Sequence, residues 1–358
     1  MEENTKPEYF KGRGSQSNPN NRFNKNSVVT EHIEGLDEPL LQSAKTEIIY
    51  THPKTIINKV DSPDIGRAYS MNPYQGCEHG CIYCYARNSH EYWGYSAGLD
   101  FERKIIVKQN VVQTLEKQFN NKRWEPLPIM LSGNTDCYQP IERKLEITRG
   151  ILKSCLKFKH PVSVITKNAL ITRDIDILQE LAQLNLVHVM VSITGLNEDT
   201  RQLLEPRTAT YKNRLRVLQT LSKANIPCGV MVAPIIPGIN NHEIINVIEQ
   251  AALYGAQTAG YTLVRLNGAI GDIFKDWLYK SYPDRADKVW NQICDCHGGQ
   301  VNDSRYGTRM HGEGKFAESI QQLFTLARKK HMGGFPKFEF DLTKFDYRAG
   351  DAQLRIFD

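Results

Sequence analysis

The chain has 358 residues, of which 40% are hydrophobic and 24% are charged, so it is long enough for one large domain or two ordinary ones. Its mean hydropathy is −0.47 and no apolar run approaches the ~20 residues of a membrane helix, which argues against a membrane protein. The net charge of +5 is weaker than the basic excess typical of a dedicated nucleic-acid-binding domain.

The N-terminal part of the chain differs in composition from the rest. Residues 1–30 are polar and rich in Asn, Ser, Gly and Lys, which predicts a disordered arm. They lack the apolar segment of a secretory signal, so we expect a cytoplasmic protein. Residues 31–67 carry short apolar runs, and we expect them to wrap the following domain as an extension.

From residue 68 onward, short apolar runs alternate with longer helix-like stretches. The predicted strands cover 68–72, 129–132, 162–166, 188–193, 228–234 and 258–263. The predicted helices between them cover 106–119, 142–157, 174–183, 212–224 and 241–254. Val189, Met190 and Val191 are apolar without alternation, as in strands covered on both faces. Strands that alternate with helices of this length predict parallel βαβ units.

The fold class is therefore α/β. Residues 68–268 hold six such units, and a complete barrel has eight. The pattern predicts an incomplete parallel (β/α)6 TIM-like barrel with the N-terminal extension before it. Residues 269–358 contain an aromatic helix-like segment at 273–282, a Gly-rich polar stretch and a helix at 316–330. We expect this region to form a C-terminal cap over the barrel mouth.

Three of the eight cysteines are crowded into one short motif. Cys77, Cys81 and Cys84 follow the spacing C-x3-C-x2-C, in a chain for which a disulfide framework is not expected. Three thiolates on one loop can each bind one iron of a [4Fe–4S] cluster and leave the fourth iron open to an external ligand. Gly76 and Gly80 let the backbone curl around such a cluster.

A zinc site is the alternative interpretation of this motif. His79 is the candidate fourth ligand, but its place between two of the cysteines makes joint ligation strained. The motif follows the first predicted strand, and ligands in such folds bind at the carboxyl ends of the strands. The motif therefore lies where an active site is expected.

The motif Cys-x3-Cys-x-Tyr-Cys, heading a partial barrel over about 68–268, resembles the radical S-adenosylmethionine (SAM) superfamily. The resemblance implies a [4Fe–4S] cluster whose open iron is chelated by the amine and carboxylate of SAM. It implies reductive cleavage of SAM to a 5′-deoxyadenosyl radical, which abstracts hydrogen from the substrate. It also implies a reducing partner such as flavodoxin or ferredoxin.

The ends of the later strands resemble one branch of that superfamily, the spore photoproduct lyase-like (SPL-like) proteins. The matching segments are 132–136, 166–167, 191–194, 205–208 and 229–235. The resemblance implies that Thr135, Lys167 and Ser192 hold SAM, with the backbone of Ala233 near the adenine. Hydrogen-bonding and charge chemistry add further candidates. The complete predicted SAM-binding set is Tyr83, Thr135, Asp136, Lys167, Ser192, Arg207 and Ala233.

Several of these residues have structural alternatives. Asp136 can cap the following helix, Ser192 can be an ordinary strand residue, and Arg207 can form a surface ion pair. Tyr83 can fill the core instead of packing on the adenine, and Tyr85 is a candidate to face the path of the radical. Their shared position at strand ends or beside the cysteines favours the ligand-binding interpretation.

The resemblance breaks at the substrate. Photoproduct lyases carry a catalytic cysteine where this chain has Gly133, so the resemblance is to an SPL-like subgroup that lacks it. Cys137 lies four residues further on, which in an extended segment is about 13 Å away, and we expect it to be a small buried residue. The predicted substrate is a nucleic acid or a nucleotide. The alternatives are a peptide or small metabolite, or a non-catalytic iron–sulfur or zinc protein.

Further candidate groups lie outside the barrel motifs. Cys294, Cys296 and His297 are a candidate second metal site, although C-x-C lacks the usual spacer and no fourth ligand is evident. Arg305 and Arg309 can bind an anionic substrate or belong to a solvated loop. A basic group after the fourth predicted strand is expected to form a solvated helix face, with phosphate contacts as the alternative: Arg201, Arg207, Lys212, Arg214 and Arg216.

Overall fold

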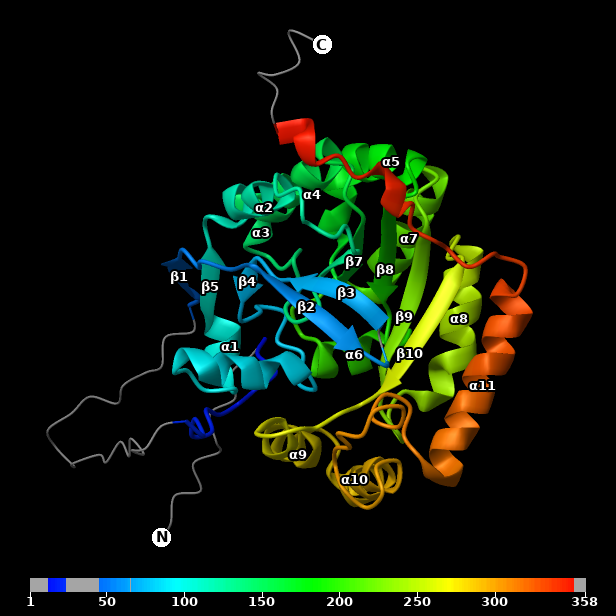
Figure 1. Cartoon of the computed structure of the whole chain (residues 1–358). Helices are drawn as coiled ribbons and strands as arrows, with labels where there is room; N and C mark the ends of the chain where they lie inside the picture. Colours follow the sequence, from blue (N-terminus) through cyan, green and yellow to red (C-terminus); the bar gives the residue numbers. More distant parts are fainter. Residues whose placement is uncertain (1–11, 24–44, 65, 351–358) are drawn as a thin grey trace, which may run out of the picture.

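A seven-stranded sheet forms the centre of the molecule. The computed structural model describes residues 12–23, 45–64 and 66–350. The sheet has the order β10-β9-β8-β7-β6-β3-β2, and its edge strand β2 (Ile57–Ser62) is antiparallel to its neighbour. The remaining strands are parallel: β3 (Gly66–Met71), β6 (Ile129–Leu131), β7 (Val162–Thr166), β8 (Val187–Ser192), β9 (Cys228–Ile235) and β10 (Thr258–Leu263). They match the six predicted strands, and the sheet curls into an open half-barrel (Figure 1), which confirms the predicted fold class.

Five helices cover the outer face of this sheet: α2 (Val111–Phe119), α4 (Ile147–Lys157), α5 (Ile175–Gln183), α7 (Tyr211–Lys223) and α8 (Ile244–Leu253). They correspond to the five predicted helices, with two differences. Residues 106–108 were predicted as helix but belong to β5 (Lys104–Lys108), which pairs with β1 (Glu47–Thr51) and β4 (Tyr74–Gln75). Glu146 has a φ of 51°, which separates α3 (Glu142–Leu145) from α4.

The parallel strands have two unequal faces. In β7 and β8 the fully buried positions alternate with half-buried ones. Val164 and Val189 belong to the buried set, which packs against the helices in one large core. Ile165 and Met190 belong to the other set, which lies on the inner face of the curled sheet. The inner face of the half-barrel is therefore more accessible than the face that the helices cover.

Part of the predicted disordered arm has a defined place. Residues 12–23 lie against α1 (Leu99–Arg103) and the 3-10 helix η1 (Tyr85–Trp93). The buried carboxylate of Glu102 accepts hydrogen bonds from the backbone amides of Gly14 (3.1 Å) and Ser15 (2.8 Å). The expectation of disorder was therefore wrong for this stretch, because a carboxylate far along the chain fixes its backbone. The rest of the arm lies outside the described residues.

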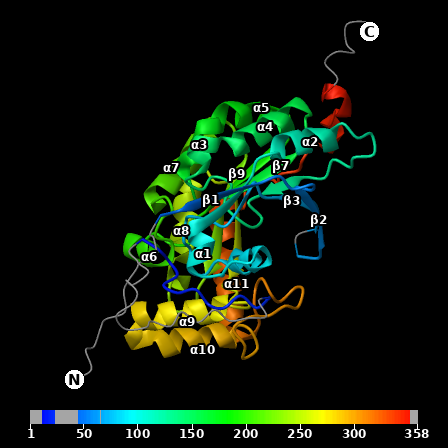
Figure 2. The ribbon, with the colours of Figure 1, turned by 90° about the vertical axis from the view of Figure 1, so that its left-hand side faces the viewer.

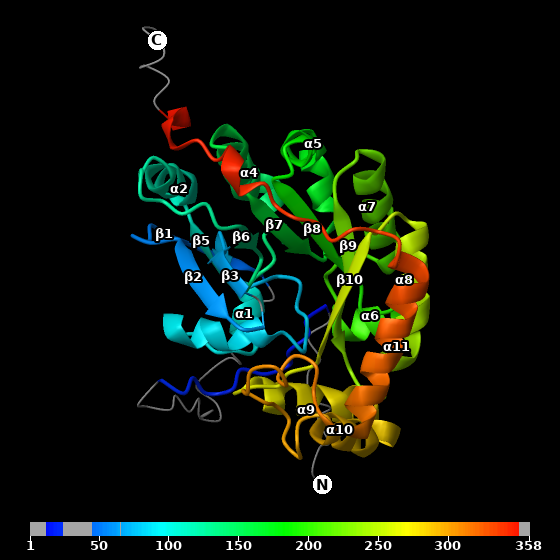
Figure 3. The same ribbon diagram turned by 45° about the vertical axis from the view of Figure 1, so that its right-hand side comes forward.

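The C-terminal region contains three helices. Helices α9 (Ile270–Ser281) and α10 (Ala286–Asp295) lie beyond the carboxyl ends of the strands (Figures 1 and 2), where the cap was predicted. Helix α11 (Gly314–Met332) packs along α8, and the tail after it crosses the opposite end of the sheet (Figure 3). There Asp341 N donates to Asn185 O at 3.1 Å, just before β8. Among the described helices, none is long and apolar enough to cross a membrane.

Candidate functional site

The cysteine loop runs from Gly76 to Cys84, between β4 and η1, and other parts of the chain hold it. Cys77 N donates to Phe101 O at 2.9 Å, and Ile82 N donates to Leu204 O at 3.0 Å. The side chain of Gln139 forms two hydrogen bonds with the backbone at the start of the loop. Its Oε1 accepts from Glu78 N at 3.0 Å, and its Nε2 donates to Gly76 O at 3.1 Å. The loop conformation is therefore fixed from three sides.

The two glycines of the loop have conformations that other residues rarely adopt. Gly76 has a φ of 79° and Gly80 a φ of 68°. A Cβ on Gly76 would lie 2.7 Å from Lys104 O, and a Cβ on Gly80 would lie 3.0 Å from a carboxylate oxygen of Glu102. The sequence-based explanation for these glycines, a tightly curled backbone, agrees with the structure.

A buried ion pair supports the far side of the loop. Arg87 and Glu102 are both fully buried, and Arg87 Nη2 lies 2.5 Å from Glu102 Oε1. The same guanidinium donates to Cys81 O through Nε (3.1 Å) and Nη2 (3.0 Å). Charge-assisted hydrogen bonds of this kind are the stronger ones in proteins. Sequence reasoning missed this pair, which joins the cysteine loop to α1 and to residues 12–23.

The three thiols of the loop are close enough to influence one another. Cys77 and Cys81 are buried, Cys84 is half-buried, and none is in a disulfide. Burial raises the pKa of all three thiols, and for Cys81 it raises the pKa to about 12. A thiolate charge on one cysteine would also disfavour ionisation of its neighbours. Charges on Cys81 and Cys84 raise the pKa of Cys77, and a charge on Cys84 raises the pKa of Cys81. Such thiols stay protonated unless a cation or a metal binds them.

Two further observations bear on what the thiols can hold. Within residues 12–23, 45–64 and 66–350, no three His, Cys, Asp or Glu side chains are arranged to hold a metal ion. A four-iron cluster has a different requirement, because each thiolate binds its own iron. Three unpaired thiols on a loop curled by two glycines, near one another but without a fourth ligand, fit that donor set.

Asp136 connects the ends of two strands with the cysteine loop. Its Oδ1 accepts from Thr166 Oγ1 at 2.8 Å, and its Oδ2 accepts from Lys167 N at 2.8 Å. Its Oδ2 also lies 3.4 Å from His79 Nδ1, and His79 Nε2 lies 3.2 Å from Asn168 Nδ2. Asp136 accepts from Tyr138 N at 2.9 Å as well, in a local turn rather than a helix cap. Both carboxylate oxygens of Asp136 therefore accept hydrogen bonds from the chain itself.

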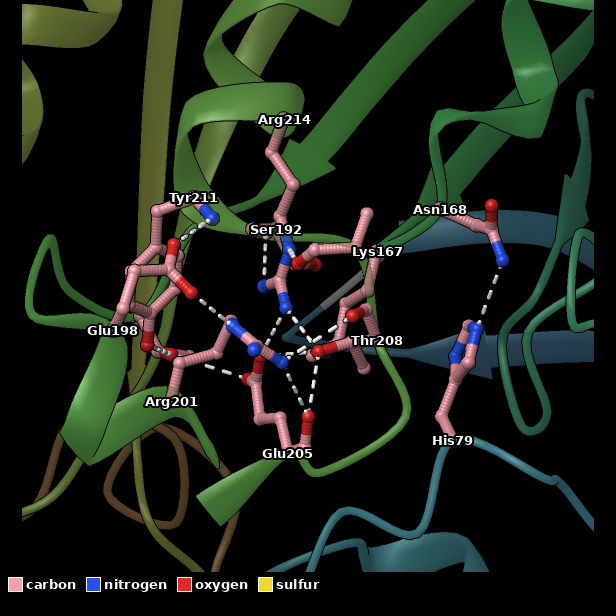
Figure 4. A network of polar contacts seen from close by, with 12 residues as sticks. His79, Lys167, Asn168, Ser192, Glu198, Arg201, Glu205, Thr208, Tyr211 and Arg214 are labelled. Atoms are coloured by element: carbon pink, nitrogen blue, oxygen red, sulfur yellow. Dashed lines mark hydrogen bonds and ion pairs between the residues drawn. The ribbon is translucent and has the colours of Figure 1, made fainter. Parts of the chain in front are cut away.

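A buried charge network surrounds Glu205 and Arg214 (Figure 4). Glu205 and Arg214 are fully buried and form an ion pair, and the phenol of Tyr83 donates to Glu205. Arg214 Nη1 also donates to Ser192 O at 3.0 Å. Burial would raise the pKa of Glu205, but the charges of Arg214 and Lys167 lower it to about 2. Glu205 is therefore ionised, and the network fixes Tyr83 beside the cysteines.

Arg214 corrects one prediction. It was grouped with the solvated residues Lys212 and Arg216, which are exposed, but its own side chain has no exposed surface. Tyr211 and Leu218 are buried on the same helix, three residues before and four after it. That helical spacing was the available signal that Arg214 faces the barrel. Arg201 is also buried and donates to Glu205 O at 3.1 Å.

Lys167 and Ser192 have polar side-chain groups that form no hydrogen bond with the described residues. Lys167 Nζ lies 5.9 Å from the centroid of the Tyr83 ring, and within the described part of the chain it donates no hydrogen bond. Ser192 is the last residue of β8, and its hydroxyl bonds to none of the described residues. Both groups therefore fit a role in binding the carboxylate or the hydroxyls of a ligand.

The other predicted SAM residues are placed differently. The hydroxyl of Thr135 donates to Tyr74 O at 2.6 Å, so it joins β4 to the end of β6. Arg207 Nη2 lies 3.4 Å from Glu78 Oε1, an ion pair on the outer side of the cysteine loop. Ala233 is half-buried within β9, before a cis peptide bond to Pro234. The side chains of Thr135 and Arg207 thus have partners within the chain, unlike those of Lys167 and Ser192.

The remaining sequence candidates lie elsewhere. Cys137 is fully buried in the main core, as expected for a small packing residue. His297 Nε2 contacts Val264 O at 2.8 Å, and Cys294 is half-buried at the end of α10. Arg305 pairs with Asp303 at 2.7 Å and Arg309 pairs with Asp64 at 2.5 Å, so both arginines have carboxylate partners.

Comparison with known proteins agrees with this architecture. Residues 71–251 match the family described as Radical SAM superfamily. An uncharacterized protein of Mycobacterium tuberculosis is 31% identical over 234 residues, which cover 64% of this chain and 69% of the relative. The sporulation killing factor maturation protein SkfB of Bacillus subtilis is 27% identical over 222 residues, which cover 60% of this chain and 46% of SkfB.

The fold is also similar to a solved structure. Spore photoproduct lyase complexed with dinucleoside spore photoproduct superposes with a TM-score of 0.60 at 14% sequence identity, and the alignment covers 80% of each chain. At this identity the similarity concerns the fold alone. It confirms that the half-barrel has the architecture that the sequence predicted.

Proposed function

The chain belongs to the radical SAM superfamily, and from this membership we propose that Cys77, Cys81 and Cys84 hold a [4Fe–4S] cluster at which SAM is cleaved reductively. When bound, the cluster and SAM supply a 5′-deoxyadenosyl radical that abstracts hydrogen from a substrate. The observation that carries the proposal is the set of three unpaired, mutually interacting thiols on a loop that Gln139 and Arg87 hold in place.

The residues around this loop have distinct proposed tasks. Lys167 pairs with the carboxylate of SAM, because its ammonium donates to no described residue. Ser192 binds a hydroxyl of SAM, and Tyr83, Thr135, Arg207 and the backbone of Ala233 complete the proposed SAM-binding set. Asp136 holds the backbone of Lys167 in place. Glu205 and Arg214 hold Tyr83 in place, so these two residues act by positioning Tyr83 rather than by contacting SAM.

We further propose a nucleic acid or a nucleotide as the substrate. The names of similar proteins differ on this point, because spore photoproduct lyase was solved with a dinucleoside and SkfB is a maturation protein for a sporulation killing factor. The substrate class must therefore be argued from the side chains of this chain. A reductant such as flavodoxin or ferredoxin is part of the same proposal.

The full chain, reconstituted anaerobically with iron and sulfide, tests the proposal. With SAM and a reductant it is expected to form 5′-deoxyadenosine. Cys81→Ala is expected to lose four-iron content and this activity while it stays folded. Cys294→Ala is the matched control, since Cys294 is half-buried and lies in the cap, and it is expected to keep both. Wild-type iron content in Cys81→Ala would contradict the ligand assignment, and bound zinc without SAM cleavage would favour a non-catalytic protein.

A second pair of variants tests the SAM-binding assignment. Lys167→Met is expected to weaken SAM binding by about tenfold or more, because a charge-assisted hydrogen bond contributes ~1.5–3 kcal/mol. Lys144→Met changes an exposed lysine of α3 and is expected to leave SAM binding unchanged. Equal SAM dissociation constants for the two variants would refute the role of Lys167.

A further inference from the structure

Arg265 is a half-buried arginine of the barrel whose guanidinium forms no ion pair with a described residue. It follows β10 by two residues, at the end of the sheet where the cap begins. Its Nη1 lies 3.7 Å from the sulfur of Met310, and its Nε is buried without a hydrogen-bond partner. Within the described residues it forms no ion pair. A buried polar donor without a partner indicates that a hydrogen-bonding group is missing at this place.

The carboxylates near Arg265 are engaged by other arginines. Arg309 pairs with Asp64 at 2.5 Å, and Arg305 pairs with Asp303 at 2.7 Å. Burial lowers the pKa of Arg265 and the positive charge of Arg309 lowers it further, whereas the charges of Asp64 and Asp303 act to raise it. A partly desolvated guanidinium beside a second one is costly to a folded chain unless an anion compensates it. Neither carboxylate forms an ion pair with Arg265, so its guanidinium is available to an external anion.

The side chains next to Arg265 connect this place with the cysteine loop. Tyr85 follows Cys84 directly, its hydroxyl donates to Gly133 O at 2.5 Å, and 52% of its surface is exposed. Arg265 acts electrostatically on the phenol of Tyr85. Asn88 Nδ2 donates to Asn267 O at 2.7 Å, while the Oδ1 atoms of both asparagines are buried without a donor. An aromatic face, a free guanidinium and two free acceptors thus occur in neighbouring segments.

We propose that Arg265 binds a phosphate group of a nucleotide unit in the substrate, next to the exposed ring of Tyr85. A guanidinium binds phosphate with two parallel hydrogen bonds, and an aromatic ring offers a stacking face to a base. The free amide oxygens suit the N–H donors of a base edge. This inference rests on the proposed function, since it names the substrate class for the same barrel and the residues that recognise it.

The test uses the reconstituted full chain and a fluorescent single-stranded decadeoxythymidylate at several salt concentrations. Arg265→Gln is expected to weaken binding by about tenfold to a hundredfold, the loss expected for one charge-assisted contact. The slope of log affinity against log salt is expected to fall by about 0.7, because one phosphate contact is lost. Arg305→Gln is the control, since Arg305 is paired with Asp303 and Glu313, and it is expected to change neither quantity.

Two further readouts separate a binding role of Arg265 from a purely structural one. Thermal unfolding of Arg265→Gln is expected to match or exceed the wild-type Tm, because an uncompensated cation is removed. SAM cleavage without substrate is expected to stay at the wild-type rate. If the wild type forms no 5′-deoxyadenosine but binds the oligonucleotide through Arg265, the proposed function fails and the phosphate site stands.

Several results would overturn the phosphate site. One is a wild-type chain that does not bind the oligonucleotide, and another is an Arg265→Gln variant with wild-type affinity and salt slope. A third is Arg265-dependent binding of an oligoglutamate peptide with no such dependence for the oligonucleotide, which would assign the guanidinium to a carboxylate. A markedly lower Tm for Arg265→Gln would assign it a structural role.

Discussion

Replacement of Glu205 by glutamine tests the buried network that positions Tyr83. The carboxylate of Glu205 pairs with Arg214 and accepts hydrogen bonds from Tyr83 and Thr194. Both members of the ion pair have fully buried side chains. Glutamine preserves the shape but leaves the guanidinium of Arg214 without a counter-charge, and breaking a buried pair in this way costs ~3–5 kcal/mol of unfolding free energy.

The pKa of Glu205 gives a second route to the same magnitude. Burial acts to raise this pKa, yet Arg214, Lys167 and the hydrogen bond from Tyr83 bring it from 4.5 to about 2. At about 1.4 kcal/mol per pH unit, this difference corresponds to about 3 kcal/mol. Because the pKa is lower in the folded state than in the unfolded state, the stabilisation is complete above pH 4.5. It is lost as the pH falls through about 2.

Urea unfolding of the wild type and Glu205→Gln measures this effect. The gap between their unfolding free energies is expected to be about 3 kcal/mol at pH 7 and to narrow by about 1.4 kcal/mol at pH 3.5. Asp276→Asn is the control, because Asp276 forms an exposed ion pair with Lys280 and its loss is expected to cost less than about 1 kcal/mol. A gap that does not depend on pH, or one no larger than that of the control, would refute this account of the network.

Two further outcomes follow from the backbone and from a buried histidine. Gly76→Ala places a Cβ 2.7 Å from Lys104 O at a φ of 79°, so we expect this variant to lose bound iron. Gly94→Ala is the control, because Gly94 has a similar φ of 81° but lies in open space, and it is expected to keep its iron. Equal iron contents in the two variants would contradict this reasoning. Burial lowers the pKa of His160 to about 3 from 6.5, so its stabilising contribution is complete above pH 6.5 and is lost as the pH falls toward 3. At pH 5 the loss is about 2 kcal/mol. Urea unfolding from pH 7 to 5 is expected to show a shallower pH dependence for His160→Gln than for His242→Gln, which changes an exposed histidine.

The sequence predicted the barrel well because the pattern of each unit is local. The runs at 162–166 and 258–263 are strands over the predicted residues, and the apolar spacing of α5 and α8 appears within each segment. The failures have distant causes. Residues 104–108 form a strand because they pair with Glu47–Thr51, which lies more than fifty residues upstream. Residues 12–23 are placed by Glu102, which no local pattern within the arm indicates.

The candidate site was predictable as a set of positions but not as a set of contacts. The cysteine spacing located the loop, and the parallel topology indicated that residues after the strands would gather near it. The use of each side chain depends on its neighbour in space. The hydroxyl of Thr135 donates to Tyr74 O, whereas neither the ammonium of Lys167 nor the hydroxyl of Ser192 forms a hydrogen bond with a described residue. Thr135 and Ser192 looked equivalent in the sequence, and only the partner atoms separate a structural hydroxyl from one available to a ligand.

The same reasoning distinguishes three arginines that sequence alone cannot rank. Arg214 is fully buried against Glu205, and Arg309 is paired with Asp64, so each charge is compensated within the chain. Arg265 lies at the same end of the barrel without a carboxylate of its own and has a buried unpaired Nε. Because an unpaired desolvated charge is unfavourable for folding, its presence is explained more readily by a ligand than by stability. The guanidinium that forms no ion pair with the described residues is therefore the group that we propose to bind a substrate anion, beside the tyrosine that follows the last cysteine.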